Sequence, residues 1–449
     1  MGHAIRTIMK TPLRIGVAGL GTVGASLLRL LAQRRAALGL VAGRPIDVVA
    51  VSARDRTRDR GVDLSGYTWF DDPVALAREA EVDCVVELIG GSDGPAKATV
   101  EAALARGVHV VTANKALLAA HGMDLAVEAE RRGAALAFEA AVAGGIPVIK
   151  TVRESLVGNE ITQIAGILNG TCNYILSRME QDNLSFEKCL AEAQKLGYAE
   201  ADPTFDVDGH DTAHKLAILA SLAFGGRIDA DAVRVEGIRS IKQIDIRMAN
   251  RLGYRIKLLG VAVRTADGVE QRVCPTMVEK TQPLARVMGV TNAVNIDANA
   301  VGELTLVGPG AGGDATASSV IADIVDIAQA GSRGPVFAAP AGDLQHMERA
   351  PVKDHPGGYY VRVNLLDKPG AAASVVSRMA EAGISLESIV QRRSPKAAER
   401  DPTGRSGAKV PVILITYDTT EDAVRGALQK AVADGFVGSS PQVIRIERN

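Results

Sequence analysis

One short segment of the chain concentrates side chains that could exchange a proton with a substrate. It runs from Gly197 to Lys215, and its five carboxylates are Glu200, Asp202, Asp206, Asp208 and Asp211. Asp211 and Lys215 are four residues apart, so they share one face of a helix that begins near His210. Mostly apolar residues follow Lys215, which predicts a buried helix. An ammonium group beside several acids at the start of such a helix predicts a functional site. The alternative is an ordinary surface ion pair.

Two metal sites have to be weighed in the same segment. Asp206, Asp208 and His210 alternate as calcium ligands do, but Asp211 stands where an EF-hand loop needs glycine. His210 and His214 have a spacing that suits zinc on a helix, but no third ligand is evident. We therefore expect neither site.

A glycine turn near the start of the chain indicates dinucleotide binding. A buried strand pattern from Leu13 to Ala18 is followed by Gly19, Gly21 and Gly24 and then by a helix pattern. Such glycines allow a tight turn, close approach of the backbone to a pyrophosphate, and close contact between helix and strand. The alternative is a purely structural turn.

The end of the second predicted strand, Ile46 to Ser52, bears on the choice of cofactor. A carboxylate there would bind the 2′-hydroxyl of NAD, whereas an arginine can bind the 2′-phosphate of NADP. Arg54 favours NADP, although Asp55 follows it and could still bind a ribose. The alternative is that Arg54 and the arginines at 56, 58 and 60 form a solvated loop.

Strand and helix patterns alternate up to about residue 140, which predicts a parallel sheet. Ligands bind beyond the carboxyl ends of such strands, where Gly90, Gly91, Asn114 and Lys115 lie. Lys115 is therefore a site candidate, and the alternative is a lysine that merely begins a helix.

The remaining chain divides by its patterns into further parts. Thr171 is expected to cap the helix from Asn173 to Gln181, and Asp314 the helix from Ala315 to Ala330. We predict an α/β fold made of a Rossmann-type dinucleotide-binding domain over 1–140, an α+β substrate-binding domain over 141–307, a segment over 308–335 that returns to the nucleotide domain, a linker over 336–356, and a ferredoxin-like βαββαβ domain over 357–449.

The composition argues against several classes of protein. The 51 Lys and Arg nearly balance the 52 Asp and Glu, so we expect no nucleic acid or anionic membrane as a partner. The four cysteines make no CxxC motif, so neither a disulfide framework nor a zinc cluster is indicated. No apolar run is long enough to cross a membrane and no signal peptide is evident, so we expect a cytoplasmic protein.

Five runs of the sequence together resemble the homoserine dehydrogenase family: GLGTVG, TANK, GILNGTCNYIL, GYAEADPTFDVDGHDTAHK and GPGAGGDATASSV. The resemblance covers essentially the whole chain. It implies that L-homoserine and L-aspartate 4-semialdehyde are interconverted by hydride transfer, in the biosynthesis of threonine, methionine and isoleucine. The C-terminal part, with Asp367-Lys-Pro-Gly370, resembles the ACT domain, an amino-acid-sensing module, and implies a threonine effector.

The resemblance also implies roles for single residues and a homodimer or homotetramer. Lys215 would exchange a proton with the C4 oxygen of the substrate, with Lys115 beside it, and Glu200 and Asp211 would hold homoserine. NADP, or alternatively NAD, would be bound by Gly19, Gly21, Thr22, Val23, Gly24, Arg54, Lys115, Gly197 and Gly313. A monovalent cation, sodium in the family, would be held by the backbone carbonyls of Glu139, Val142, Gly144 and Ile146.

Two other functions stay open at this point. A semialdehyde dehydrogenase would work through a thiolate, and Cys172 is the only cysteine near the predicted site, but no base is evident beside it. A non-catalytic sensor of nucleotide and amino acid would need no proton shuttle.

Overall fold

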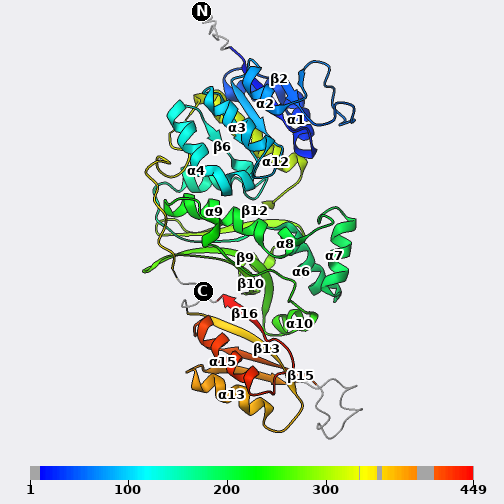
Figure 1. Ribbon diagram of the computed structural model, residues 1–449, viewed down its shortest axis with the longest axis vertical. Coiled ribbons are helices and arrows are strands. Elements are labelled where there is room, and N and C mark those ends of the chain that lie inside the picture. The colour runs from blue at the N-terminus through cyan, green and yellow to red at the C-terminus, as the bar shows by residue number, and fades with distance from the viewer. Residues whose placement is uncertain (1–10, 333, 351–355, 392–408, 448–449) are drawn as a thin grey trace, which may run out of the picture.

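The computed structural model describes residues 11–332, 334–350, 356–391 and 409–447. Its parts follow one another along the long axis of the molecule, with the first domain at the top of Figure 1, the second domain in the middle and the C-terminal domain at the bottom. No helix in the described ranges is both long and apolar enough to cross a membrane.

The first domain is built on six parallel strands in the order β3-β2-β1-β4-β5-β6. The predicted parallel sheet is therefore confirmed. Its elements are β1 (Leu13–Ala18), α1 (Thr22–Ala42), β2 (Ile46–Ser52), β3 (Thr68–Phe70), α2 (Pro73–Glu79), β4 (Cys84–Glu87), α3 (Pro95–Ala105), β5 (His109–Thr112), α4 (Lys115–Arg132) and β6 (Leu136–Ala137).

A mixed sheet and several helices form the second domain, which is reached through the short helix η1 (Glu139–Ala141). The helix predicted to begin near His210 is confirmed and is buried along most of its length. The elements are α5 (Val148–Lys150), η2 (Thr151–Ser155), β7 (Ile161–Ile167), α6 (Gly170–Asp182), α7 (Phe186–Lys195), α8 (Thr204–Val207), α9 (His210–Phe224), η3 (Ala230–Ala232), β8 (Arg234–Val235), α10 (Gln243–Arg251), β9 (Tyr254–Thr265), β10 (Gly268–Glu279), α11 (Pro283–Arg286), β11 (Thr291–Ala298) and β12 (Gly302–Pro309).

The C-terminal domain has the predicted βαββαβ order. Its elements are β13 (Gly358–Leu366), α13 (Ala371–Glu381), β14 (Leu386–Gln391), β15 (Lys409–Thr416), α15 (Glu421–Ala433) and β16 (Gln442–Glu447). Strand β16 pairs with β13 on one side and, over three residues, with β10 on the other. One ten-stranded sheet, β12-β11-β7-β9-β10-β16-β13-β15-β14 with β8 also on β10, therefore runs through both domains.

After β12 the chain returns to the nucleotide domain as α12 (Gly313–Ala330), which lies beside α1 in Figure 1. Val320 and Ile324 of α12 share an apolar core with Leu27 and Leu31 of α1. The cap predicted at Asp314 is wrong, because the helix begins at Gly313, two residues before the predicted start at Ala315, and the Asp314 carboxylate pairs with Arg29 of α1 instead.

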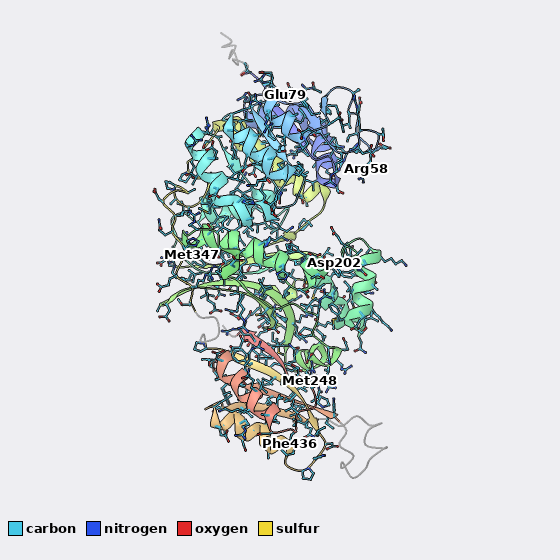
Figure 2. The ribbon with its side chains drawn as sticks, viewed as in Figure 1. Arg58, Glu79, Asp202, Met248, Met347 and Phe436 are labelled. Atoms are coloured by element: carbon cyan, nitrogen blue, oxygen red, sulfur yellow. The ribbon has the colours of Figure 1, made fainter. Side chains whose placement is uncertain are left out.

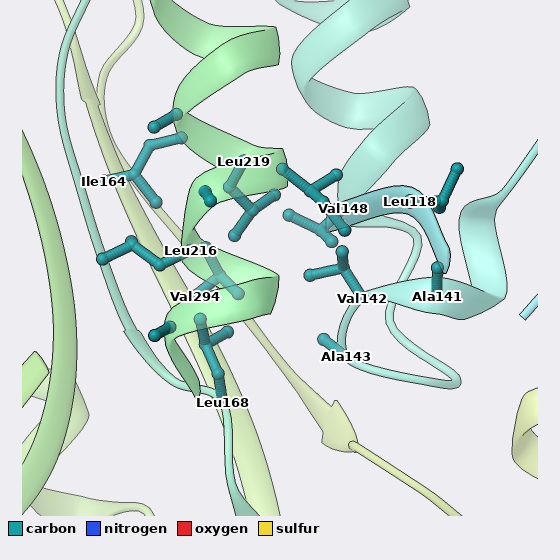
Figure 3. Packing of buried hydrophobic residues seen from close by; sticks show 14 of the residues in the cluster. Leu118, Ala141, Val142, Ala143, Val148, Ile164, Leu168, Leu216, Leu219 and Val294 are labelled. Carbon is teal, nitrogen blue, oxygen red and sulfur yellow. The ribbon is translucent and has the colours of Figure 1, made fainter. Parts of the chain in front are cut away.

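The core between the first two domains surrounds the start of α9. Figure 3 shows Leu216 and Leu219 of α9 packed in one cluster with Val142 and Val148 of the connecting segment. All four side chains are fully buried. This packing fixes the helix that carries Asp211 and Lys215 against the connection to the nucleotide domain.

Candidate active site

A buried carboxylate joins lysines from two domains. Asp211 lies in the first turn of α9 and its side chain is only 6% exposed. Its Oδ2 accepts a hydrogen bond from Lys215 Nζ at 2.8 Å, and its Oδ1 lies 3.0 Å from Nζ of Lys115, the first residue of α4. Lys215 Nζ also donates to the carbonyl oxygen of Leu168 at 2.7 Å. The two candidate lysines thus meet at one carboxylate.

Asn169 links this carboxylate to a second one. Its Nδ2 donates to Asp206 Oδ1 and to Asp211 Oδ2, both at 2.8 Å. Burial raises the pKa of Asp211, but the Lys215 and Lys115 charges and the hydrogen bonds from Lys215 and Asn169 outweigh it, so the pKa lies below its ordinary value. Burial and the charge of Asp211 raise the pKa of Asp206. Asp211 is therefore the fixed anion of the pair.

The other three carboxylates of the segment make no hydrogen bond or ion pair with this cluster in the described structure. Glu200 is exposed, and its backbone carbonyl accepts from Gln194 at 3.0 Å. Asp202 accepts from the Thr204 backbone N–H at 3.0 Å, and Asp208 pairs with Arg239 at 2.5 Å. In the described part of the chain no group of His, Cys, Asp and Glu side chains is arranged to hold a metal ion.

The glycine turn has the geometry that close approach of a nucleotide requires. Gly19 has a φ of +106°, and a Cβ there would lie 2.4 Å from the Leu88 carbonyl oxygen. A Cβ on Gly24 would lie 2.1 Å from the Gly19 carbonyl oxygen, whereas one on Gly21 would meet nothing within 4 Å. The turn therefore needs Gly19 and Gly24 for its own packing, and Gly21 leaves the start of α1 open.

A cavity of about 310 Å³ lies beside this turn. Among the residues that line it are Gly19, Gly21, Ser52, Arg54, Arg58 and Arg60. Arg60 holds the loop in place by donating to the carbonyl oxygens of Leu20 at 3.0 Å and Arg58 at 2.7 Å. Figure 2 labels Arg58 on this loop and Asp202 in the domain below it.

Two arginines on that loop have guanidinium groups without a partner among the described residues. The guanidinium groups of Arg54 and Arg58 have neither hydrogen bond nor ion pair with any residue that the structure describes. The Asp55 carboxylate, in contrast, accepts from the backbone N–H and the hydroxyl of Thr57, at 2.8 and 2.6 Å. Asp55 and Asp71 also line the cavity, but both carboxylates already accept hydrogen bonds, Asp55 from Thr57 and Asp71 from Trp69 Nε1 at 2.7 Å. The guanidinium groups of Arg54 and Arg58 are thus the charges at the cavity that have no partner in the described structure.

The remaining residues predicted to bind cofactor fall into two places. Thr22 and Val23 begin α1, and a Cβ on Gly313 would lie 2.5 Å from Ser26 Oγ and 3.1 Å from Thr22 Cγ2. Gly313 therefore sits directly against the start of α1. Gly197, with a φ of +77°, lies in the exposed turn after α7 in the other domain.

Glu87 is a site-building residue that the sequence reasoning missed. At the end of β4 and fully buried, it accepts from the backbone N–H groups of Ile89 at 2.7 Å and Gly90 at 3.1 Å, and from the Thr112 hydroxyl at 2.6 Å. Asn114 donates to the Gly91 carbonyl at 2.7 Å and caps α4. These residues hold the Gly90-Gly91 loop next to Lys115. Glu87 could have been found from the sequence, because a carboxylate at the end of a buried strand needs hydrogen-bond donors around it.

The four positions expected to hold a cation lie on the segment that connects the domains. Ala143 and Gly144 have φ values of +55° and +51°, so the chain turns sharply there. The Gly144 carbonyl accepts from Ser319 Oγ at 2.7 Å and the Ile146 carbonyl from the Val148 N–H at 2.8 Å. The Glu139 carboxylate accepts from two backbone N–H groups at the start of α5, and burial raises its pKa to about 7.

Cys172 does not have the surroundings of a nucleophile. It is fully buried, and its Sγ donates to the Asp206 carbonyl oxygen at 3.3 Å. Burial and the charges of Asp206 and Asp211 raise the pKa of the thiol. The thiol of Cys172 is therefore poorly suited to thiolate chemistry.

The fold and the site are typical of a dinucleotide-dependent oxidoreductase. The first domain has a parallel sheet with an open glycine turn, and its Lys115 pairs with the buried Asp211 of the second domain. The sequence matches the family models described as homoserine dehydrogenase, NAD binding domain, over residues 19–139, homoserine dehydrogenase over 147–325, and ACT domain over 359–430. The chain belongs to the homoserine dehydrogenase family.

Individual relatives agree with this assignment. The homoserine dehydrogenase of Pseudomonas aeruginosa is 44% identical over 447 residues, which cover 97% of this chain and 98% of the relative. That of Mycobacterium tuberculosis is 40% identical over 97% of this chain and 98% of its own. The crystal structure of a homoserine dehydrogenase from Thiobacillus denitrificans superposes with a TM-score of 0.90 at 39% identity, covering 98% of this chain and 99% of that one.

Proposed function

We propose that this protein is an NADP-dependent homoserine dehydrogenase in which Lys215 exchanges the proton. The observation that carries the proposal is the pairing of Lys115 and Lys215 with the buried Asp211 carboxylate, at 3.0 and 2.8 Å. Oxidation of homoserine to aspartate 4-semialdehyde removes a hydride from C4 and a proton from the C4 oxygen, and reduction adds both back. The nicotinamide cofactor accepts or donates only the hydride. The protein must provide the proton's donor and acceptor, and a lysine can serve in both directions.

The proposed roles follow from these contacts. Lys215 is held by Asp211 and the Leu168 carbonyl, so its third N–H bond stays available for the C4 oxygen of the substrate. Lys115, about one-third exposed, supplies a second positive charge near that oxygen. We assign Glu200 and Asp211 to the amino and hydroxyl groups of homoserine.

NADP is the proposed cofactor because the guanidinium groups of Arg54 and Arg58, which have no partner in the described structure, line the cavity beside the glycine turn. Gly19, Gly21, Thr22, Val23, Gly24, Gly313 and Lys115 would contact it along its length, with Gly197 reaching it from the other domain. Arg54, with Arg58 beside it, would bind the 2′-phosphate. A hyperthermophilic archaeal relative, 26% identical over 70% of this chain and 97% of its own with a TM-score of 0.61, was solved in complex with NADPH.

A monovalent cation is proposed at the connecting segment. Its ligands would be the carbonyl oxygens of Glu139, Val142, Gly144 and Ile146, a donor set of the kind that binds K⁺ elsewhere. Each carbonyl has two lone pairs, so the hydrogen bonds to Gly144 and Ile146 leave one free on each. The cation would stiffen the connection between the domains.

We further propose regulation by an amino acid bound to the C-terminal domain, with threonine as the effector, and a homodimer or homotetramer as the working form. The reaction then belongs to threonine, methionine and isoleucine biosynthesis. One assay tests the activity: homoserine oxidation with NADP and with NAD, each with and without threonine. Absence of homoserine oxidation with either cofactor would overturn the proposal.

The role of Lys215 has its own test. Lys215→Met should bind NADPH as tightly as the unaltered protein, but its kcat should fall about 10²- to 10⁴-fold because the proton partner is lost. Lys195→Met, at an exposed lysine in the last turn of α7, is the matched control and should keep full activity. Normal turnover in Lys215→Met would remove Lys215 from the mechanism.

A further inference from the structure

We propose that Asn169 is a positioning residue for the reaction, one that holds the Asp206 and Asp211 carboxylates together beside the two lysines. The proposal rests on the proposed function of the lysine cluster and adds to it a residue that acts through the two carboxylates. Asn169 lies directly between the end of β7 and the start of α6 and is 6% exposed.

The hydrogen bonds of Asn169 are fully directed by its surroundings. The two hydrogens of Nδ2 go to Asp206 Oδ1 and Asp211 Oδ2, both at 2.8 Å, and Oδ1 accepts from the Cys172 backbone N–H at 2.8 Å. The preceding residue, Leu168, gives its carbonyl oxygen to Lys215. Two consecutive residues after β7 therefore orient both the proton carrier and its counterion.

The charges show why the two carboxylates need the pair of hydrogen bonds from Asn169, which we call the clamp. The buried Asp211 carboxylate and the half-buried Asp206 carboxylate share one nitrogen and repel each other, and a carboxylate that loses both water and its partner is costly. Among the described residues, Asn169 is the only hydrogen-bond partner of the Asp206 carboxylate. Without the amide, Asp206 would turn away or take up a proton, and the charge around Lys115 and Lys215 would change.

Asn169 also caps α6, so the test must separate the two tasks. Serine is as good an N-cap as asparagine but cannot donate to two carboxylates, so Asn169→Ser keeps the cap and removes the clamp. Asn169→Asp keeps the cap and the size but places a third carboxylate in the cluster. Asn299→Ser, an exposed asparagine that accepts from the Glu160 N–H at 3.0 Å, is the matched control.

We expect Asn169→Ser to retain the thermal midpoint and NADPH affinity of the unaltered protein while kcat falls about 10- to 100-fold. Asn169→Asp should lose more, and Asn299→Ser nothing. The acid limb of the rate profile should move to higher pH in Asn169→Ser. The reason is that a hydrogen bond to the charged form is lost, which raises the pKa of Asp206. That carboxyl faces Lys115 of α4 and Asp211 and Lys215 of α9.

A second measurement works even if homoserine is not the substrate. Difference infrared spectra of the protein with ¹³C-labelled aspartate follow the carboxyl titrations directly, and Asn169→Ser should shift one of them to higher pH. An unchanged titration and unchanged kcat would show that Asn169 only caps α6. A lower thermal midpoint or weaker NADPH binding accompanying the loss of kcat would also overturn the proposal, because the helix would then be at fault.

Discussion

Removal of the two arginines that have no described partner beside the glycine turn should change the cofactor preference. A charge-assisted hydrogen bond contributes about 1.5 to 3 kcal/mol, and each 1.4 kcal/mol is a tenfold change in affinity. Arg54 and Arg58 are both exposed at the cavity, so we take the lower end of that range. Arg54→Ala and Arg58→Ala should each weaken NADPH binding about tenfold, and the double variant up to about 100-fold. NADH has no 2′-phosphate and should bind as before.

The measurement is the dissociation constant of each reduced cofactor, followed by its fluorescence, at two salt concentrations. Arg56→Ala is the matched control, because it removes the same charge from the same loop but its guanidinium lies 5.7 Å above the Trp69 ring and does not line the cavity. The NADPH effect should shrink at high salt, since exposed charges are screened. The reasoning would be refuted by a preference for NADPH over NADH that changes no more in Arg54→Ala and Arg58→Ala than in Arg56→Ala.

Two further predictions concern stability. Burial lowers the pKa of Lys257 from 10.5 to about 8, so the unfolded chain binds more protons between these values, and the free energy of unfolding should rise by about 3 kcal/mol from pH 8 to 10.5. Urea unfolding should show a flatter rise in Lys257→Met, and an equal rise would contradict this origin. Arg362→Met removes the guanidinium from the fully buried Asp245 and should destabilise the protein by about 3 to 5 kcal/mol. Adding Asp245→Asn should restore part of the loss, and full additivity of the two substitutions would argue against the pair.

The sequence predicted the helices and strands better than the contacts between them. The four-residue spacing alone predicted that Asp211 and Lys215 share one helix face. The rule that ligands bind beyond the carboxyl ends of parallel strands correctly predicted the edge of the sheet at which Lys115 lies. The roles of Leu168 and Asn169 depend on where β7 ends against α9, which no local pattern records. Thr171 was wrongly predicted as the cap of α6: its hydroxyl donates to the Tyr198 carbonyl at 2.6 Å, and Asn169 caps the helix instead.

The sequence also did not predict the contacts between segments that are far apart along the chain. The pairing of β10 with β16 joins residues near 277 and 446, and it involves only three positions, too few to leave a periodic signal. The buried charges that accompany it, such as Asp245 with Arg362, resemble surface residues when read along the chain. Patterns of apolar residues identified both domains but not the sheet that they share.

That shared sheet makes the C-terminal domain a poor candidate for simple excision. A protein truncated after residue 356 would lack β16, so the backbone of Thr276 to Val278 in β10 would lose its partner strand. It would also lack Arg362, so Asp245, which is fully buried in the intact protein, would lose its ion pair. A bare strand edge invites another chain to add to it. A variant free of the proposed amino-acid regulation is therefore better sought by point substitution in the C-terminal domain, because truncation would leave the edge of β10 open to aggregation.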